Sequence, residues 1–149
     1  MTTKAGKDGR FYIATDDDID GSPTWTELDI VEDVEQDSTK ESAEVKNRAS
    51  DEITMLALHR KRQVTCTITH TPGNTVYESI RDAFENDSAL AIAVMDGAVA
   101  TVGSEGLMMD VIVTQFKRSE QLSQRMAYDV TFEPSAAAGT TPAWTEVSA

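Results

Sequence analysis

Residues 63–70 place the strongest constraint on the fold, because apolar and polar side chains alternate strictly along them. Val64, Cys66 and Ile68 share one face, and the intervening threonines share the other. β-Branched residues with a period of two are typical of a half-buried strand. The Thr-Pro-Gly segment at 71–73 ends this strand, since proline lacks an amide donor and glycine adopts turn conformations readily. A half-buried strand requires further strands beside it.

One amphipathic helix is predicted directly after this strand. Asn74 is suited to cap its first turn. The apolar residues that follow recur at the spacing of one helical face; they are Val76, Tyr77, Ile80, Ala83 and Phe84. Residues 89–95 contain no polar side chain, which is typical of a strand covered on both faces. We therefore predict a helix over about 74–86 between two strands.

Alternation predicts further strands on both sides of this unit, at 10–15, 25–28, 42–50, 107–116 and 122–132. The last two are expected to form a hairpin across 117–121. Residues 52–59 are compatible with a strand or with a packed loop. The predicted fold class is mainly β, a β-sandwich or barrel with one flanking α-helix.

The length of 149 residues and the hydrophobic content of 40% suit a single domain with a real core. We expect a flexible N-terminal arm over 1–9, one β domain over 10–134 and a C-terminal arm over 135–149. Within the domain, residues at about 34–42 are expected to form a long polar loop. No apolar run has the length of a membrane span and no signal peptide is evident, so we expect cytosolic synthesis without membrane contact.

The net charge of −13 argues against nucleic-acid binding through a basic surface. The only basic cluster is Arg60-Lys61-Arg62, which we interpret as a solvated strand edge. An acidic protein can still handle DNA by repelling it, so that the DNA slides without sticking.

No catalytic pattern is present. The chain lacks a phosphate-binding glycine loop, a zinc-type Cys/His spacing and a hydrolase elbow. His59 and His70 have no nucleophile beside them, and the single Cys66 is expected to be a small core residue. We predict no enzyme activity and no cofactor.

One segment matches the EF-hand calcium loop, with Asp16, Asp18, Asp20 and, in the twelfth position, Glu27. The context differs, because a strand rather than a helix precedes it and Pro23 lacks the backbone N–H. The first interpretation is an acidic, solvated connection. The alternative is a calcium-binding β-sandwich module that uses residues 16–27.

A short similarity links residues 23–28 (PTWTEL) with residues 142–147 (PAWTEV). Chance accounts for six residues in a chain rich in threonine and alanine. The alternative is that Trp25 and Trp144 dock on similar sheet edges, one of them on a neighbouring subunit.

The order of these features resembles the tail tube (major tail) proteins of long-tailed bacteriophages. A Pro-x-Trp-Thr segment at 23–26 leads into an acidic apolar stretch at 28–34, then a polar loop and residues 40–50. The alternating strand, the helix and the strand at 91–97 follow. The similarity runs from about 25 to 134. One departure lies at 51–55, where a loop bearing glycine and tryptophan is expected in the family.

The resemblance implies a β-sandwich-like barrel whose copies close into hexameric rings that stack into a tube. It implies a virion tail protein made in the host cytoplasm, with a tape-measure protein and other tail proteins as partners and with DNA only in transit. The residues implied at the contacts between subunits and rings are Trp25, Val34, Gln36, Asp37, Ser38, Thr39, Lys40, Glu41 and Trp144.

Several predicted strands carry polar faces, which are either solvated or line the channel of a tube. The candidate lumen residues are Glu44, Lys46, Arg48, Thr65, Thr67, Thr69, Ser123, Arg125 and Asp129.

Overall fold

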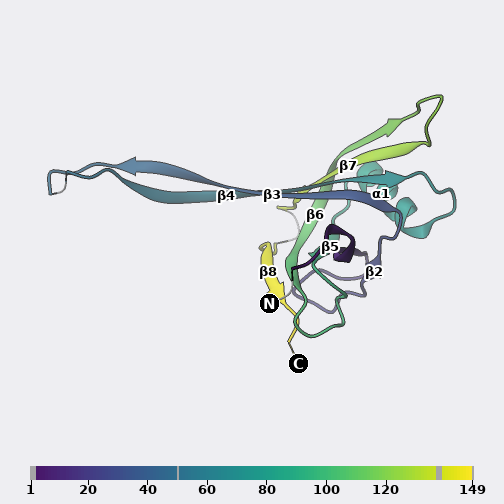
Figure 1. The fold of residues 1–149 in the computed structure, drawn as a ribbon, viewed down its shortest axis with the longest axis horizontal. Helices are drawn as coiled ribbons and strands as arrows, with labels where there is room; N and C mark the ends of the chain where they lie inside the picture. The colour runs from purple at the N-terminus through teal and green to yellow at the C-terminus, as the bar shows by residue number, and fades with distance from the viewer. Residues whose placement is uncertain (1–2, 50, 137–138, 149) are drawn as a thin grey trace.

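The computed structural model describes residues 3–49, 51–136 and 139–148. Their strands form one eight-stranded antiparallel sheet in the order β2-β1-β5-β6-β7-β4-β3, with β8 paired to β6 beside this path (Figure 1). The elements are η1, a 3-10 turn (Gly6–Asp8), β1 (Arg10–Ala14), β2 (Thr26–Glu27), β3 (Val31–Val45), β4 (Thr54–Thr69), α1 (Thr75–Asn86), β5 (Leu90–Met95), β6 (Glu105–Ser119), β7 (Ala127–Pro134) and β8 (Ala143–Glu146).

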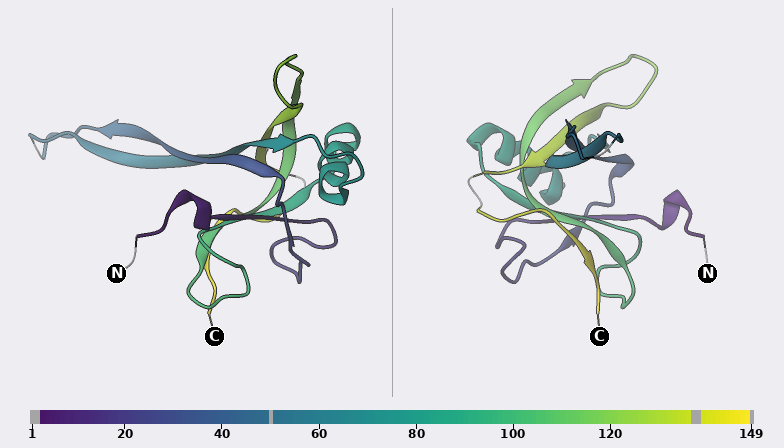
Figure 2. Two further views of the ribbon diagram at one scale, coloured as in Figure 1. Left: turned by 45° about the vertical axis from the view of Figure 1, so that its right-hand side comes forward. Right: turned by 90° about the vertical axis from the view of Figure 1, so that its left-hand side faces the viewer.

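Strand β6 joins two halves of the sheet that fold over one another (Figure 2). It pairs with β5 through residues 106–111 and with β7 through residues 111–119. Phe11 of β1 and Phe132 of β7 belong to opposite halves, and their ring centroids lie 5.7 Å apart. The main core therefore lies between the halves. The predicted mainly β, sandwich-like architecture with one helix is confirmed.

The apolar periodicity predicted the inner faces of the central strands. Val64, Cys66 and Ile68 are buried, whereas the threonines between them are only partly covered. Strand β5 is buried on both faces, as its lack of polar residues predicts. Each large apolar side chain buried in this way stabilises the fold by roughly 1.5–3 kcal/mol. The pairing of β5 with β6 also requires Gly106, because a Cβ there would lie 1.9 Å from the Val94 carbonyl oxygen.

Helix α1 begins where its capping residue Asn74 predicts and ends at Asn86, as the predicted range does. The Asn74 side chain accepts hydrogen bonds from the backbone N–H groups of Val76 and Tyr77, at 3.0 and 3.1 Å. Asp87 ends the helix in the left-handed conformation, with φ of 56°. The apolar face packs into the main core, and the Phe84 ring stacks on Phe116 of β6 with centroids 6.0 Å apart. The prediction of a helix over about 74–86 is confirmed.

Strands β3 and β4 are much longer than the sequence predicted. β4 pairs with β7 only from Val64 to Thr69, so its earlier residues and their β3 partners project from the body as a two-stranded ribbon (Figures 1 and 2). The prediction of a loop at about 34–42 is wrong, because these residues pair with β4 inside β3. Residues 52–59, left open between strand and loop, belong to β4 from Thr54 onward.

The observed ends of other strands differ from the predicted ends by a few residues. The strand predicted at 42–50 ends at Val45, and residue 50 lies outside the described residues. The predicted hairpin between β6 and β7 is present, but β7 begins at Ala127 rather than at Leu122. Ser123 and Arg125 therefore lie in the connection and not on a strand face.

Both predicted terminal arms contact the body where they are described. Residues 6–8 form η1, and β8 pairs with β6 so that Trp144 lies opposite Leu107. Residues 1–2, 137–138 and 149 of the predicted arms lie outside the described residues. Among the described residues, no helix has the length and apolar character that a bilayer crossing requires.

Candidate assembly surfaces

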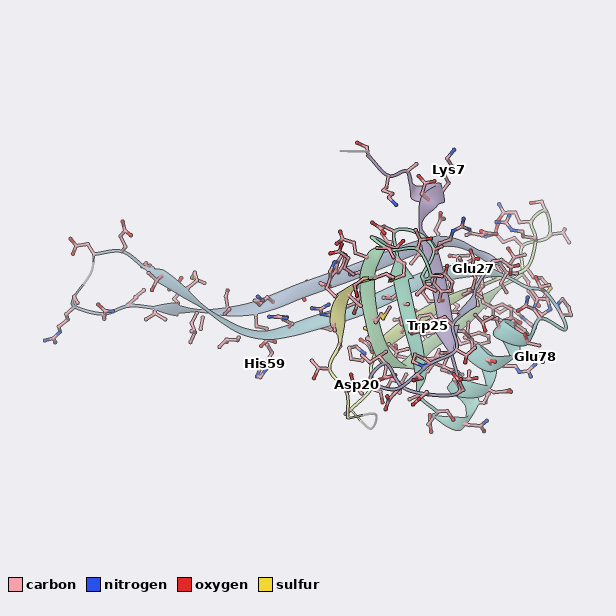
Figure 3. The ribbon with its side chains drawn as sticks, turned by 90° about the horizontal axis from the view of Figure 1, so that it is seen from below. Lys7, Asp20, Trp25, Glu27, His59 and Glu78 are labelled. Carbon is pink, nitrogen blue, oxygen red and sulfur yellow. The ribbon has the colours of Figure 1, made fainter. Side chains whose placement is uncertain are left out.

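The ribbon of residues 37–63, which the structure describes for 37–49 and 51–63, is called the arm below and is the most exposed part of the sheet (Figure 3). Within the arm each strand pairs only with the other one, because β4 pairs with β7 only from Val64 to Thr69. Two-stranded hairpins are at best marginally stable in water when nothing covers them. The arm is therefore suited to a contact with another molecule.

The end of the arm carries large apolar side chains that solvent reaches. Their exposed fractions run from 38% to 58%, and they form the apolar tip: Val45, Ile53, Met55, Leu56 and Leu58. Val45, Leu56 and Leu58 lie on one face of the ribbon and Ile53 and Met55 on the other. Clusters of exposed apolar side chains mark interaction sites in soluble proteins. The sequence alternation did not single them out, because neither face of this ribbon is buried.

The arm also differs from the body in charge. Residues 37–63 contain six Lys and Arg and five Asp and Glu, a net charge of +1, which leaves −14 for the rest of the chain. Four cations form a basic band at the middle of the arm: Lys40, Arg60, Lys61 and Arg62. No ion pair joins these cations to an acidic side chain within the described ranges.

The predicted interface residues fall on separate surfaces. Val34 and Gln36 lie at the root of the arm, and residues 37–41 lie along it. Trp25 packs inside its own chain, against Tyr12 and Met95, whereas Trp144 on β8 remains 57% exposed. The two segments that share the PxWTE pattern thus do form short strands on the sheet, β2 against β1 and β8 against β6.

The candidate lumen residues divide into two groups. Thr65, Thr67, Thr69 and Asp129 occupy the polar face of β4 and β7, where the Thr67 hydroxyl donates to the Asp129 carboxylate at 3.1 Å. Glu44, Lys46 and Arg48 lie instead near the far end of the arm. Lys46 Nζ is 3.7 Å from Glu44 Oε2, so their charges partly cancel.

Sequence reasoning missed Glu32 on this polar face. Its carboxylate accepts hydrogen bonds from Arg125 (Nε at 2.6 Å) and from the Thr69 hydroxyl at 2.8 Å. Both hydrogen bonds lower the pKa of Glu32, and the bond from Arg125 has the larger effect. Glu32 also lines a hollow of about 920 Å³ with Asp33, Glu35 and Asp129. The acidic stretch at 28–34 was the available signal, but its spacing does not place Glu32 beside Arg125.

The structure does not assemble the predicted calcium ligands. Asp16 accepts from the Thr24 backbone N–H at 3.0 Å, and Asp18 accepts from those of Asp20 and Gly21, at 3.1 and 2.9 Å. Glu27 is paired with Arg10 at 2.9 Å. No group of three or more His, Cys, Asp or Glu side chains within the described residues is placed to hold a metal ion. The carboxylates close the loop by binding its backbone.

The histidines and the cysteine occupy structural positions. His59 projects from the arm (Figure 3). The His70 ring packs against Tyr77 and Tyr128, with ring centroids 5.3 and 5.4 Å away. Burial raises the pKa of the Cys66 thiol to about 12, so the nucleophilic thiolate is scarce at neutral pH. This arrangement brings none of the three together as a catalytic group.

Comparison with known proteins identifies the architecture. No protein-family model and no curated protein sequence matches the chain. Among solved structures, the SPP1 tail tube superposes with a TM-score of 0.75 and 9% identity, over 99% of this chain and 81% of that one. The tail of an empty gene transfer agent particle, solved with C6 symmetry, superposes with a TM-score of 0.70 and 12% identity, over 98% and 100%. The chain has the tail-tube fold.

A third solved structure shows the same fold. A chain from the baseplate of the anti-feeding prophage superposes with a TM-score of 0.64 and 9% identity, over 99% of both chains. The tail-tube fold therefore covers nearly the whole of this chain, including the arm. The resemblance found in the order of sequence elements is confirmed at the level of fold.

Proposed function

We propose that this chain is a structural subunit of the tail tube of a phage-like particle. Its copies close into hexameric rings, and the rings stack into a hollow tube. The observation that carries the proposal is the uncovered arm with its apolar tip, on a chain whose tail-tube fold spans nearly its full length. The C6 symmetry of the gene transfer agent tail supports the six-fold ring.

The contacts between subunits use surfaces that the isolated chain leaves uncovered. The body over residues 10–134 forms the ring, the arm reaches a neighbouring subunit, and the terminal segments 1–9 and 135–149 add contacts. The exposed Trp144 and the free outer edge of β3 support these assignments, because uncovered strand edges readily join further chains. Trp25 packs against residues of its own chain, so it is not assigned to a contact with a neighbouring subunit.

The polar face of β4 and β7 lines the lumen in this proposal. Thr65, Thr67, Thr69 and Asp129 give it a hydrated surface, and Glu32 with Arg125 lies at its end. The strongly acidic body repels DNA, so DNA passes through without adhering. A tape-measure protein occupies the lumen before DNA does, and other tail proteins cap the tube.

The role is structural and located in the virion tail, without bond chemistry. Electron microscopy of the purified chain at increasing concentration tests it. We expect rings about one subunit high and then tubes, and image averages with six-fold symmetry. A chain that stays monomeric at millimolar concentration, over a range of salt, contradicts the proposal. Calcium should leave the assembly state and the titration heat unchanged.

A further inference from the structure

The two segments that share the PxWTE pattern, residues 23–27 and 142–146, lie in different surroundings. Each contributes a short edge strand to the sheet, β2 beside β1 and β8 beside β6. In both segments the tryptophan and the glutamate are two residues apart, the spacing that brings two side chains to one face of a strand. The surroundings of the same Trp-x-Glu pattern can therefore be compared within one molecule.

In the first segment both side chains have partners. Trp25 packs against the apolar cluster that contains Tyr12 and Met95. The Glu27 carboxylate accepts a hydrogen bond from the Arg10 guanidinium at 2.9 Å. Arg10 and Tyr12 are themselves two residues apart on β1. A strand that completes the Trp-x-Glu pattern thus carries a cation and an aromatic ring at alternate positions.

In the second segment both partners are missing. Trp144 is 57% exposed. Glu146 lies opposite Glu105 of β6, and neither forms an ion pair with a described cation. Like charges directly opposite one another in an antiparallel ladder are unfavourable. The Asp96 carboxylate, which accepts from the Glu105 backbone N–H at 2.9 Å, adds a third negative charge, whereas the Lys4 ammonium donates to the Asp96 carbonyl oxygen.

The backbone of β8 is also uncovered along one edge. Among the described strands, β8 pairs only with β6 (Figure 1). Its outer edge therefore presents backbone N–H and C=O groups that no strand of this chain meets. Extended segments of other proteins add to such edges, where backbone hydrogen bonds give affinity and alternate side chains give specificity. A strand added to β8 places two alternate side chains beside Trp144 and Glu146.

We propose that the outer edge of β8 binds an extended segment of a different, basic protein. One side chain of that segment is aromatic and covers Trp144, and the next but one is Arg or Lys and neutralises Glu146 and Glu105. Charge favours such a partner, because a basic protein is attracted to this surface whereas a second copy brings a net charge of −13.

The location of this contact rests on the proposed tube function. In the proposed tube, residues 135–149 also contact neighbouring subunits. The edge of β8 is therefore open to another protein where a neighbour is missing, at an end of the tube. The binding itself is a property of the single chain and is measured without tubes.

Fluorescence anisotropy with labelled peptides tests the binding on the monomeric chain. The probe is Thr-Tyr-Thr-Arg-Thr-Tyr-Thr, which presents the alternating pattern to β8 in either strand direction. One control, Thr-Thr-Tyr-Arg-Tyr-Thr-Thr, has the same composition without the cation two residues from a ring, and a second control replaces Arg with Glu. We expect the probe to bind about tenfold more tightly than either control. Equal affinities, or no binding of the probe, overturn the proposal.

Variants of the chain locate the binding site. Trp144→Ser and Glu146→Gln should each weaken binding of the probe about fivefold, and Glu146→Gln does so while keeping the shape of the side chain. The matched controls are Leu122→Ser and Glu85→Gln, at exposed positions away from β8, and they should bind like wild type. An equal loss in the controls, or none in the first pair, overturns the proposal.

A second copy is the alternative occupant of this edge. A peptide of residues 57–63 from the arm, which also combines an apolar side chain with cations, tests it by competition. We expect this peptide to displace the labelled probe only at higher concentration than the unlabelled probe does. Displacement at a lower concentration assigns the edge to a copy of this chain and overturns the proposal.

The two proposals fail in different ways. A wild-type chain that forms no rings or tubes contradicts the tube function and leaves the measured peptide binding intact. Tubes that form normally from a chain that does not distinguish the probe from its controls leave the tube function standing and remove only the partner at β8. Circular dichroism of each variant verifies that the fold is unchanged.

Discussion

The Tyr77 hydroxyl on α1 lies 3.0 Å from the Tyr128 hydroxyl on β7, and both side chains are buried. This hydrogen bond links the helix to the half of the sheet that carries the arm. The Phe116 ring packs beside it, 4.6 Å from the Tyr128 centroid. The helix is thus held by an aromatic cluster with one satisfied polar pair at its centre.

Replacing either tyrosine of this pair alone should lower the free energy of unfolding more, per hydroxyl group removed, than replacing both tyrosines together. Tyr128→Phe removes one hydrogen-bond partner of the Tyr77 hydroxyl, and the loss of such a hydrogen bond costs about 0.5–1.5 kcal/mol. The double variant Tyr77→Phe/Tyr128→Phe removes both groups, so we expect its loss to be smaller than the sum of the two single losses. Urea unfolding of the three variants measures this coupling, and strict additivity would contradict it.

Cys66 should resist alkylation in the folded protein. Burial raises the pKa of its thiol to about 12 and also hides the sulfur. We expect no iodoacetamide adduct by mass spectrometry at pH 8 in native buffer, and complete modification in urea. Because the folded pKa exceeds the unfolded one, the associated stability is present below about pH 8.5 and declines as the pH rises above it. A Cys66→Ala chain is the control for the pH effect.

The contribution of Arg125 should depend on acid pH. Its hydrogen bonds lower the pKa of Glu32, so the stabilisation is present above the unfolded value of about 4.3 and is lost as the pH falls through the folded pKa. Arg125→Gln should therefore melt slightly below wild type at pH 7, as expected for an exposed ion pair, and the difference in melting temperature should narrow as the pH falls below about 4.3. Thermal melts of both proteins between pH 7 and pH 2 measure this difference in melting temperature. A difference that does not narrow as the pH falls contradicts the prediction.

Shortening the arm should abolish tubes without unfolding the body. Asp37 and Gln63 are cross-strand partners, so residues 38–62 can be replaced by Asn-Gly, the preferred two-residue hairpin turn. The core lies outside the deleted segment, so we expect the shortened chain to keep a cooperative thermal unfolding transition, with less strand signal in circular dichroism, and to form no tubes by electron microscopy. A shortened chain that still forms tubes contradicts a role for the arm in assembly, and reinserting the wild-type segment provides the control.

Two kinds of pattern in this sequence predicted the fold. The alternation through Val64, Cys66 and Ile68 determined which face of β4 is buried, and the apolar spacing after Asn74 determined α1, because each side chain there has a single buried direction. The order of these elements also determined the resemblance to tail-tube proteins. These features are local, since the periodicity of a strand or a helix is written in neighbouring residues.

Only the tertiary structure decided where the chain leaves its surfaces uncovered. Residues 34–42 read as a loop because an exposed ribbon buries neither face, so alternation of polarity cannot mark it as a strand. The approach of Glu32 to Arg125, 93 residues apart, and the contact of Phe11 with Phe132 depend on how the two halves of the sheet fold over one another. Such long-range geometry follows from packing, which no short pattern of residues records.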